Sequence, residues 1–285
     1  MNWIIVLGVL AVIGFLLDRE IYFYEGTHLG PRLQAWLYDR WSRKYDEGKR
    51  ASQLQDNEML AQPLLDALSD VPDPFILDFA TGTGRLSHAV LYRTEFQGRI
   101  VALDLSQGML EQAVSKIKGS WQESDAPPNS AGQRIEFLRH VALPLPFPDA
   151  AFDAVCALEV LELFPGMEEP LAELSRVLRP GGLLLTSRGT EESGRRAKVK
   201  NIDEFTLLLE KTGLEQVRIT KWWKLFDRVL ALKRGSSPPR SHQNLSQVLK
   251  CSACGAIDWR QASSQWTCRQ CEKSLPRTSQ GIILN

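Results

Sequence analysis

Hydrophobic residues are most concentrated at the start of the chain. Residues 3–17, WIIVLGVLAVIGFLL, carry no charge, and the charged residues 18–20 close the run. A helix rises about 1.5 Å per residue, so the run covers roughly 22 Å of a hydrocarbon core that is about 30 Å thick. Trp3 on one side and the aromatic residues 22–24 on the other are typical of the two membrane interfaces. The pattern predicts a membrane anchor at the lower limit of length.

Two other interpretations of this segment stay open, a cleaved signal peptide and a buried core helix. No Lys or Arg precedes the run and no small-residue cleavage pattern follows it, which favours an uncleaved anchor. Basic residues gather after the run, within residues 19–50, so the positive-inside rule places the rest of the chain in the cytoplasm. Residues 1–24 are therefore predicted to be a single-pass transmembrane helix.

Beyond residue 74, short apolar runs alternate with segments of helical periodicity. The runs FILDFA, RIVALD, RIEFLR, FDAVCA and GLLLTS are separated by amphipathic segments such as EPLAELSRVLR. This alternation is typical of βα units around a parallel sheet, so the fold class is α/β. Two last strands, at 215–223 and 226–234, are close enough in sequence to pair antiparallel.

The segments around this alternation set the domain boundaries. Residues 33–50 predict a helix that either packs on the domain or forms a lid over its active site. The large side chains expected on one face of it are Trp36, Leu37, Tyr38, Trp41 and Tyr45. Residues 119–133 predict a surface loop and residues 235–246 a linker. The α/β domain is therefore assigned to 25–234 and a cysteine-bearing tail to 247–285.

Composition narrows the function classes. The 34 basic and 34 acidic residues cancel, so no charge excess of the whole chain points to nucleic acid. A hydrophobic content of 44% is ordinary for a folded protein and excludes disorder throughout the chain.

The segment ILDFATGTGRLS, residues 76–87, predicts a strand, a glycine turn and a helix that begins near Arg85. Gly82 and Gly84 have no Cβ, so a ligand can approach the backbone closely there. Asp104 ends the next predicted strand, where a carboxylate can accept hydrogen bonds from ribose hydroxyls. The alternative for Asp104 is a cap on the helix that starts near Ser106. The spacing favours a nucleotide-like cofactor.

Four motifs in order make the chain resemble the class I S-adenosylmethionine-dependent methyltransferases, in particular the type 11-like branch that acts on small molecules and lipids. The resemblance covers about residues 36–234. The motifs are LDFATGTGRL (77–86), ALDLSQGMLEQA (102–113), LPFPDAAFDAV (145–155) and ELSRVLRPGGLLLTS (173–187).

This resemblance implies a Rossmann-like seven-stranded sheet of order 3-2-1-4-5-7-6 with S-adenosylmethionine as cofactor. The cofactor-binding residues that it implies are Asp78, Ala80, Thr81, Gly82, Gly84, Asp104, Leu105, Met109 and Val141. One departure stands out, because His140, Val141 and Ala142 replace the Gly-Asp-Ala triplet of relatives. The Asp that usually receives the adenine amino group is therefore missing, and backbone groups near Val141 are the expected substitute.

Two carboxylates follow the fourth predicted strand, at the acceptor side in relatives. Glu159 and Glu162 are candidates to assist deprotonation of an acceptor, and the alternative is that both solvate the following helix. Methyl transfer needs a base only for some acceptors, so no catalytic residue is assigned.

The tail carries two CxxC pairs, Cys251 with Cys254 and Cys268 with Cys271. Two such pairs predict a closed tetrahedral Cys₄ site for structural zinc, with disulfides or a redox pair as the alternatives. A tail this short needs such a staple to fold. Cys156 lies outside the set and is predicted to be a core thiol.

We therefore predict a membrane-tethered methyltransferase that acts on a small lipophilic acceptor such as a quinone or a lipid. One alternative is an rRNA or protein methyltransferase whose zinc ribbon contacts a substrate or partner. Another is an inactive cofactor-binding scaffold.

Overall fold

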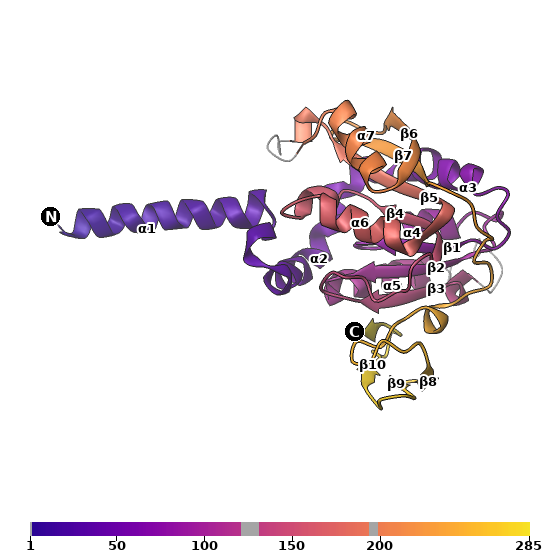
Figure 1. The fold of residues 1–285 in the computed structure, drawn as a ribbon. Helices are drawn as coiled ribbons and strands as arrows, with labels where there is room; N and C mark the ends of the chain where they lie inside the picture. Colours follow the sequence, from indigo (N-terminus) through magenta and orange to yellow (C-terminus); the bar gives the residue numbers. More distant parts are fainter. Residues whose placement is uncertain (1, 121–130, 194–198) are drawn as a thin grey trace.

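The computed structural model describes residues 2–120, 131–193 and 199–285. An α/β domain forms its centre, with one apolar helix standing away from it and a small β unit against one edge (Figure 1). The surface loop predicted at 119–133 lies mostly outside the described residues.

The projecting helix is α1, Asn2–Asp18, which continues into a turn of π-helix, η1, Arg19–Phe23. Its large apolar side chains stay exposed, Trp3 to 80% and Phe15 to 64%. The membrane-spanning helix predicted for this segment is not found, because no helix in the described part of the chain is both long and apolar enough to cross a bilayer. The 17 residues of α1 cover only about 26 Å.

Between α1 and the sheet lie a 3₁₀ turn η2, Thr27–Leu29, a long helix α2, Pro31–Gln53, a π-helical turn η3, Asn57–Ala61, and α3, Gln62–Ala67. Pro31 occupies the first turn of α2, where its missing N–H costs no hydrogen bond. α2 corresponds to the helix predicted at 33–50 and packs across α5.

The central sheet follows the predicted alternation. Its strands are β1 Phe75–Phe79, β2 Arg99–Asp104, β3 Ile135–Arg139, β4 Phe152–Ala157, β5 Leu178–Gly189, β6 Leu214–Lys221 and β7 Phe226–Lys233. The helices among them are α4 Arg85–Leu91, α5 Gln107–Ser120, α6 Glu168–Val177 and α7 Ile202–Lys211. The strand order is β11-β3-β2-β1-β4-β5-β7-β6, with β7 antiparallel to both neighbours. The predicted order 3-2-1-4-5-7-6 is confirmed, and an unpredicted eighth strand, β11, Ile283–Leu284, extends it.

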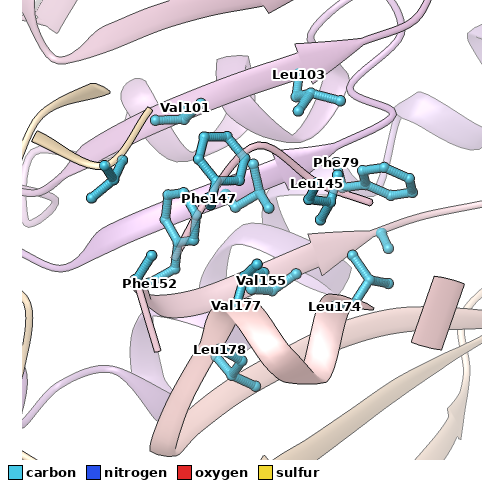
Figure 2. Close-up of a cluster of buried hydrophobic side chains, with 14 of the residues drawn as sticks. Phe79, Val101, Leu103, Leu145, Phe147, Phe152, Val155, Leu174, Val177 and Leu178 are labelled. Carbon is cyan, nitrogen blue, oxygen red and sulfur yellow. The ribbon is translucent and has the colours of Figure 1, made fainter. Parts of the chain in front are cut away.

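The core forms on both faces of this sheet because β1 and β4 are buried along their whole length, as central parallel strands require. Figure 2 shows one face, where Phe147 and Phe152 meet edge to face at 5.0 Å between ring centroids. Leu174 and Val177 of α6 cover the same cluster.

The predicted linker is fastened to the domain. Asp153 on β4 is fully buried, and its Oδ1 accepts hydrogen bonds from Arg179 Nε at 2.6 Å and from the Arg240 backbone N–H at 2.8 Å. Arg179 Nη1 also donates to the Ser237 carbonyl at 3.0 Å. A buried charge is tolerated when it is paired in this way, so residues 237–240 follow a fixed path.

The tail forms a small unit below β3 in Figure 1. After the 3₁₀ turn η7, Leu245–Gln247, strands β8 Trp259–Gln261, β9 Gln265–Cys268 and β10 Ser274–Pro276 pair as a three-stranded sheet. Trp259 and Trp266 belong to the same apolar cluster as Phe147 of the main domain. The unit therefore shares a core with the domain.

Candidate functional site

A cavity of about 920 Å³ opens at the carboxyl ends of β1, β2 and β4. The carboxyl edge of an open parallel sheet is where such folds bind ligands. Its lining includes Ala80, Gly82, Asp104, Leu105, Met109 and Val141. Further apolar and aromatic residues also line it, among them Trp41, Phe79, Leu163, Phe164, Leu225 and Phe226.

The glycine turn joins β1 to α4 and borders the cavity. Gly82 lies there with φ +56°, and its N–H donates to Asp104 Oδ2 at 2.8 Å. Gly84 has a different function, because a Cβ on it would stand 2.9 Å from Ala113 Cβ and its φ is +75°. Gly84 thus allows the turn to pack on α5, and it does not line the cavity.

Asp104 lines the cavity with a perturbed carboxyl group. Burial raises its pKa to about 6, although the N–H groups of Ser106 and Gly82 oppose the shift. The Ser106 hydroxyl, at 3.0 Å from the Met109 N–H, caps α5. Of the two roles predicted for Asp104, the cap thus belongs to Ser106, and the carboxylate retains lone pairs for a ligand.

Asp78 and Thr81 lie behind the turn. Asp78 Oδ2 accepts hydrogen bonds from Thr81 Oγ1 and Ser87 Oγ, each at 2.6 Å, and burial raises the pKa of this carboxyl. Neither Asp78 nor Thr81 lines the cavity. Both therefore hold the glycine turn in shape.

Helix α2 covers the cavity with Tyr38, Trp41 and Tyr45. The prediction for Trp36 is wrong, since it is 54% exposed on another side of the helix. Asp39, which the sequence did not single out, accepts hydrogen bonds from Ser106 Oγ at 2.6 Å and the Gly108 N–H at 2.8 Å. Its carboxylate fixes α2 to the amino end of α5, where negative charge is favoured.

The two carboxylates that follow β4, Glu159 and Glu162, are not surface groups. Glu159 adopts φ +54°, and its carboxylate contacts Lys49 Nζ at 2.5 Å and Arg85 Nη1 at 2.9 Å. Glu162 is 2% exposed and accepts a hydrogen bond from the Gly189 N–H at 2.7 Å. Both line the cavity, so the alternative that they solvate the following helix is wrong.

Lys49 and Arg85 were missed by sequence reasoning. Arg85 also binds Asp56 through two nitrogens, at 2.5 and 2.6 Å, and lies 4.7 Å above the ring of Trp222. A signal for Lys49 was present, because it lies four residues after Tyr45 and so on the same face of α2.

The four tail cysteines come together as predicted. Their sulfur atoms all lie within 4.8 Å of one another, with Cys251 Sγ and Cys271 Sγ at 3.6 Å and Cys254 Sγ and Cys268 Sγ at 3.7 Å. These separations exceed a disulfide bond and match the roughly 3.8 Å expected between thiolates around tetrahedral zinc. The residues therefore fit a zinc ion. Cys156 is a fully buried thiol on β4, and burial raises its pKa.

Comparisons with known proteins agree with this geometry. A family model described as "Methyltransferase domain" matches residues 77–186. A demethylmenaquinone methyltransferase of Lactococcus lactis is 29% identical over 51% of this chain and 54% of its own length, and one of Thermus thermophilus is 40% identical over 39% and 44%. The chain thus spans about half the length of these curated relatives.

Among solved structures, a SAM dependent methyltransferase from Aquifex aeolicus shares the fold, with a TM-score of 0.52 and 21% identity over 68% of this chain and 97% of that one. The glycine turn and Asp104 lie inside the matched segment. Residues 77–186 therefore resemble a methyltransferase domain in sequence, and the sheet that they form shares its fold with a solved methyltransferase.

Proposed function

We propose that the protein transfers a methyl group from S-adenosylmethionine to a small lipophilic acceptor. The observation that carries the proposal is one cavity lined both by the glycine turn with Asp104 and by many aromatic and aliphatic side chains. We assign the part beside the glycine turn to the cofactor, as the cofactor half, and the part lined by aromatic and aliphatic side chains to the acceptor, as the acceptor half. Such a cavity holds a charged donor beside an apolar acceptor.

In the cofactor half, Gly82 offers bare backbone and the Asp104 carboxylate would accept hydrogen bonds from the ribose hydroxyls. Leu105 and Met109 would pack against the adenine ring. When bound, the cofactor supplies an electrophilic methyl group on a sulfonium. This chain's residues contribute position and exclusion of water, which is what an in-line displacement needs.

In the acceptor half, Trp41, Phe79 and Phe164 offer flat apolar surfaces suited to an aromatic or quinone-like ring. An acceptor that loses a proton on methylation needs a base near its reacting atom. Glu159 and Glu162 are two of the carboxylates that line the cavity, and one of their oxygens would receive that proton. The curated relatives are demethylmenaquinone methyltransferases by name, which supports a quinone-like acceptor.

The cavity also adjoins the base of α1. Tyr22, Thr27 and His28 follow α1 in sequence and line the cavity. Inserting the exposed apolar side chains of α1 into a bilayer would bring the part of the cavity lined by Tyr22, Thr27 and His28 to the membrane surface, where lipophilic acceptors are concentrated. We therefore place the domain at the cytoplasmic face of a membrane, attached through α1.

The test is calorimetric titration of the full chain in detergent with S-adenosylmethionine. We expect micromolar binding that Asp104→Ala abolishes and that Asp70→Ala, a change of an exposed carboxyl, leaves intact. Absence of binding in folded protein would favour the inactive scaffold.

Methyl transfer from labelled cofactor is then measured with quinone, lipid, RNA and protein fractions. Labelling of quinone or lipid extracts supports the proposal. Labelling confined to RNA or protein would replace it with the alternative in which the ribbon contacts a macromolecular substrate.

A further inference from the structure

Asn285 contacts His140, a residue that lines the cavity. Strand β11 pairs in parallel with β3, placing Ile283 opposite Leu138 and Leu284 opposite Arg139. The N–H of Asn285 then donates to the Arg139 carbonyl at 3.1 Å. β11 therefore ends beside His140, the first residue after β3.

Apolar side chains of β11 and of the residue before it are buried against the main sheet. Ile282 is fully buried and belongs to the apolar cluster on one face of the main sheet, while Ile283 is 2% exposed and belongs to the cluster on the other face. Alternate side chains of a strand point to opposite faces, so β11 closes both faces of the sheet at the β3 edge.

Asn285 makes a directional contact with a residue that lines the cavity. Its Nδ2 lies 3.3 Å from His140 Nδ1, and His140 Nε2 lies 3.2 Å from the Pro144 carbonyl. A carbonyl only accepts, so Nε2 carries the proton and Nδ1 accepts from the Asn285 amide. The imidazole is thereby fixed at both nitrogens, in the region where relatives place the adenine-side acid.

Strand β11 is connected to the cysteine cluster through β10 and β9. β10 pairs with β9, and β9 ends at Cys268. A short turn joins β10 to β11, with the Thr278 N–H donating to the Ile282 carbonyl at 2.9 Å. The tail shares its apolar core with the main domain, and units of this size usually need an added staple, so we expect metal in the cluster to add to the support of β11.

We propose that Asn285 is a positioning residue for the cofactor site and that metal loading of Cys251, Cys254, Cys268 and Cys271 controls cofactor affinity by holding β11 on β3. His140, fixed by Asn285, forms the adenine-side wall with Val141. The inference rests on the proposed function, because it assigns this wall to S-adenosylmethionine.

The first experiment compares zinc-loaded full chain with its Asn285→Ala variant by calorimetry with S-adenosylmethionine. Loss of one hydrogen bond to this partly buried ring corresponds to an affinity weaker by about five- to tenfold. Arg260→Ala, at an exposed ion pair on the ribbon surface, is the matched control and should bind as the unchanged protein does. Nitrogen NMR of His140 should show the Nε2–H tautomer in the unchanged protein, and the Nδ1 resonance should shift in Asn285→Ala because the amide no longer donates to it.

The second experiment removes the metal with a chelator and follows hydrogen exchange in peptides 135–143 and 278–285. We expect both peptides to lose protection together, the cofactor affinity to fall at least tenfold, and zinc to restore both. Equal affinity in zinc-loaded protein, Asn285→Ala and metal-depleted protein would overturn the inference while leaving the proposed function intact.

If zinc-loaded protein binds no S-adenosylmethionine, the proposed function fails. Exchange and NMR still test whether metal and Asn285 fix His140. Unchanged exchange and an unchanged Nδ1 resonance would overturn that coupling too.

Discussion

The raised pKa of Asp104 predicts that cofactor affinity depends on pH between 5 and 7. Burial raises this pKa to about 6, and only the ionised carboxylate accepts hydrogen bonds with both oxygens. The ionised fraction is about nine tenths at pH 7 and about one tenth at pH 5. If the ionised form alone binds the ribose hydroxyls, the apparent Kd rises about tenfold over this range.

Folding should respond in the opposite direction. A carboxyl whose pKa is higher in the folded than in the unfolded chain stabilises the fold fully below its unfolded pKa of 3.8, and this contribution is lost as pH rises through about 6. Weaker cofactor binding at pH 5 therefore does not arise from unfolding through Asp104. Thermal unfolding at each pH, recorded with the calorimetric titrations, separates the two effects.

Asp104→Asn is the control variant, because it removes this ionisation and keeps a side-chain oxygen. Its affinity should be weaker at pH 7 and nearly independent of pH down to 5. A flat profile in the unchanged protein, or the same slope in Asp104→Asn, would refute the assignment of Asp104 to the ribose.

Three further changes test the packing around the site. Gly84→Ala forces a Cβ against Ala113 at positive φ and should lower the free energy of unfolding by about 2 kcal/mol; urea unfolding with unaltered stability would contradict this. Arg179→Met leaves the fully buried Asp153 without its cation and should cost about 3 kcal/mol in the same assay, whereas a neutral result would show that the backbone donors suffice. Trp41→Ala removes an aromatic wall of the acceptor half, so KM for the acceptor should rise several-fold while the cofactor Kd stays constant. A change in the cofactor Kd alone would show that Trp41 contacts the cofactor and not the acceptor.

The central sheet could be predicted because its information is local. Apolar runs such as 152–157 are long enough and regular enough to specify buried strands, and the glycine turn specifies where the first one ends. Strand β11 could not be predicted in the same way, since two residues define no periodicity. The apolar triplet 282–284 at the end of a polar tail was its only signal, and pairing with β3 depends on the tertiary fold.

In the site, too, the features that depend on local sequence could be predicted, and those that depend on tertiary packing could not. Gly82 and Asp104 form a hydrogen bond, because the turn and the end of the adjacent strand are neighbours in any such sheet. The position of Gly84 against α5 depends on the packing of two helices, which no local pattern encodes. Trp36 and Tyr38 are only two residues apart, yet they face different sides of α2, so a list of aromatics alone did not define its buried face.

The contacts of α2 decide between the two interpretations of this helix, a packed element and a lid. Asp39 holds α5, Lys49 holds Glu159, and Asp46 contacts Thr83 Oγ1 at 2.5 Å and Lys116 Nζ at 2.6 Å.

These contacts lie along the length of α2, and partly buried ion pairs are costly to open one by one. The helix is therefore both a cavity wall and a packed element, and opening it would break several of these contacts together. An acceptor that enters without displacing α2 would use the side lined by Tyr22, Thr27 and His28, where the apolar α1 joins the domain. Shortening α1 should then raise KM for a lipophilic acceptor presented in vesicles more than for the same acceptor in detergent. Equal changes in the two would exclude this route.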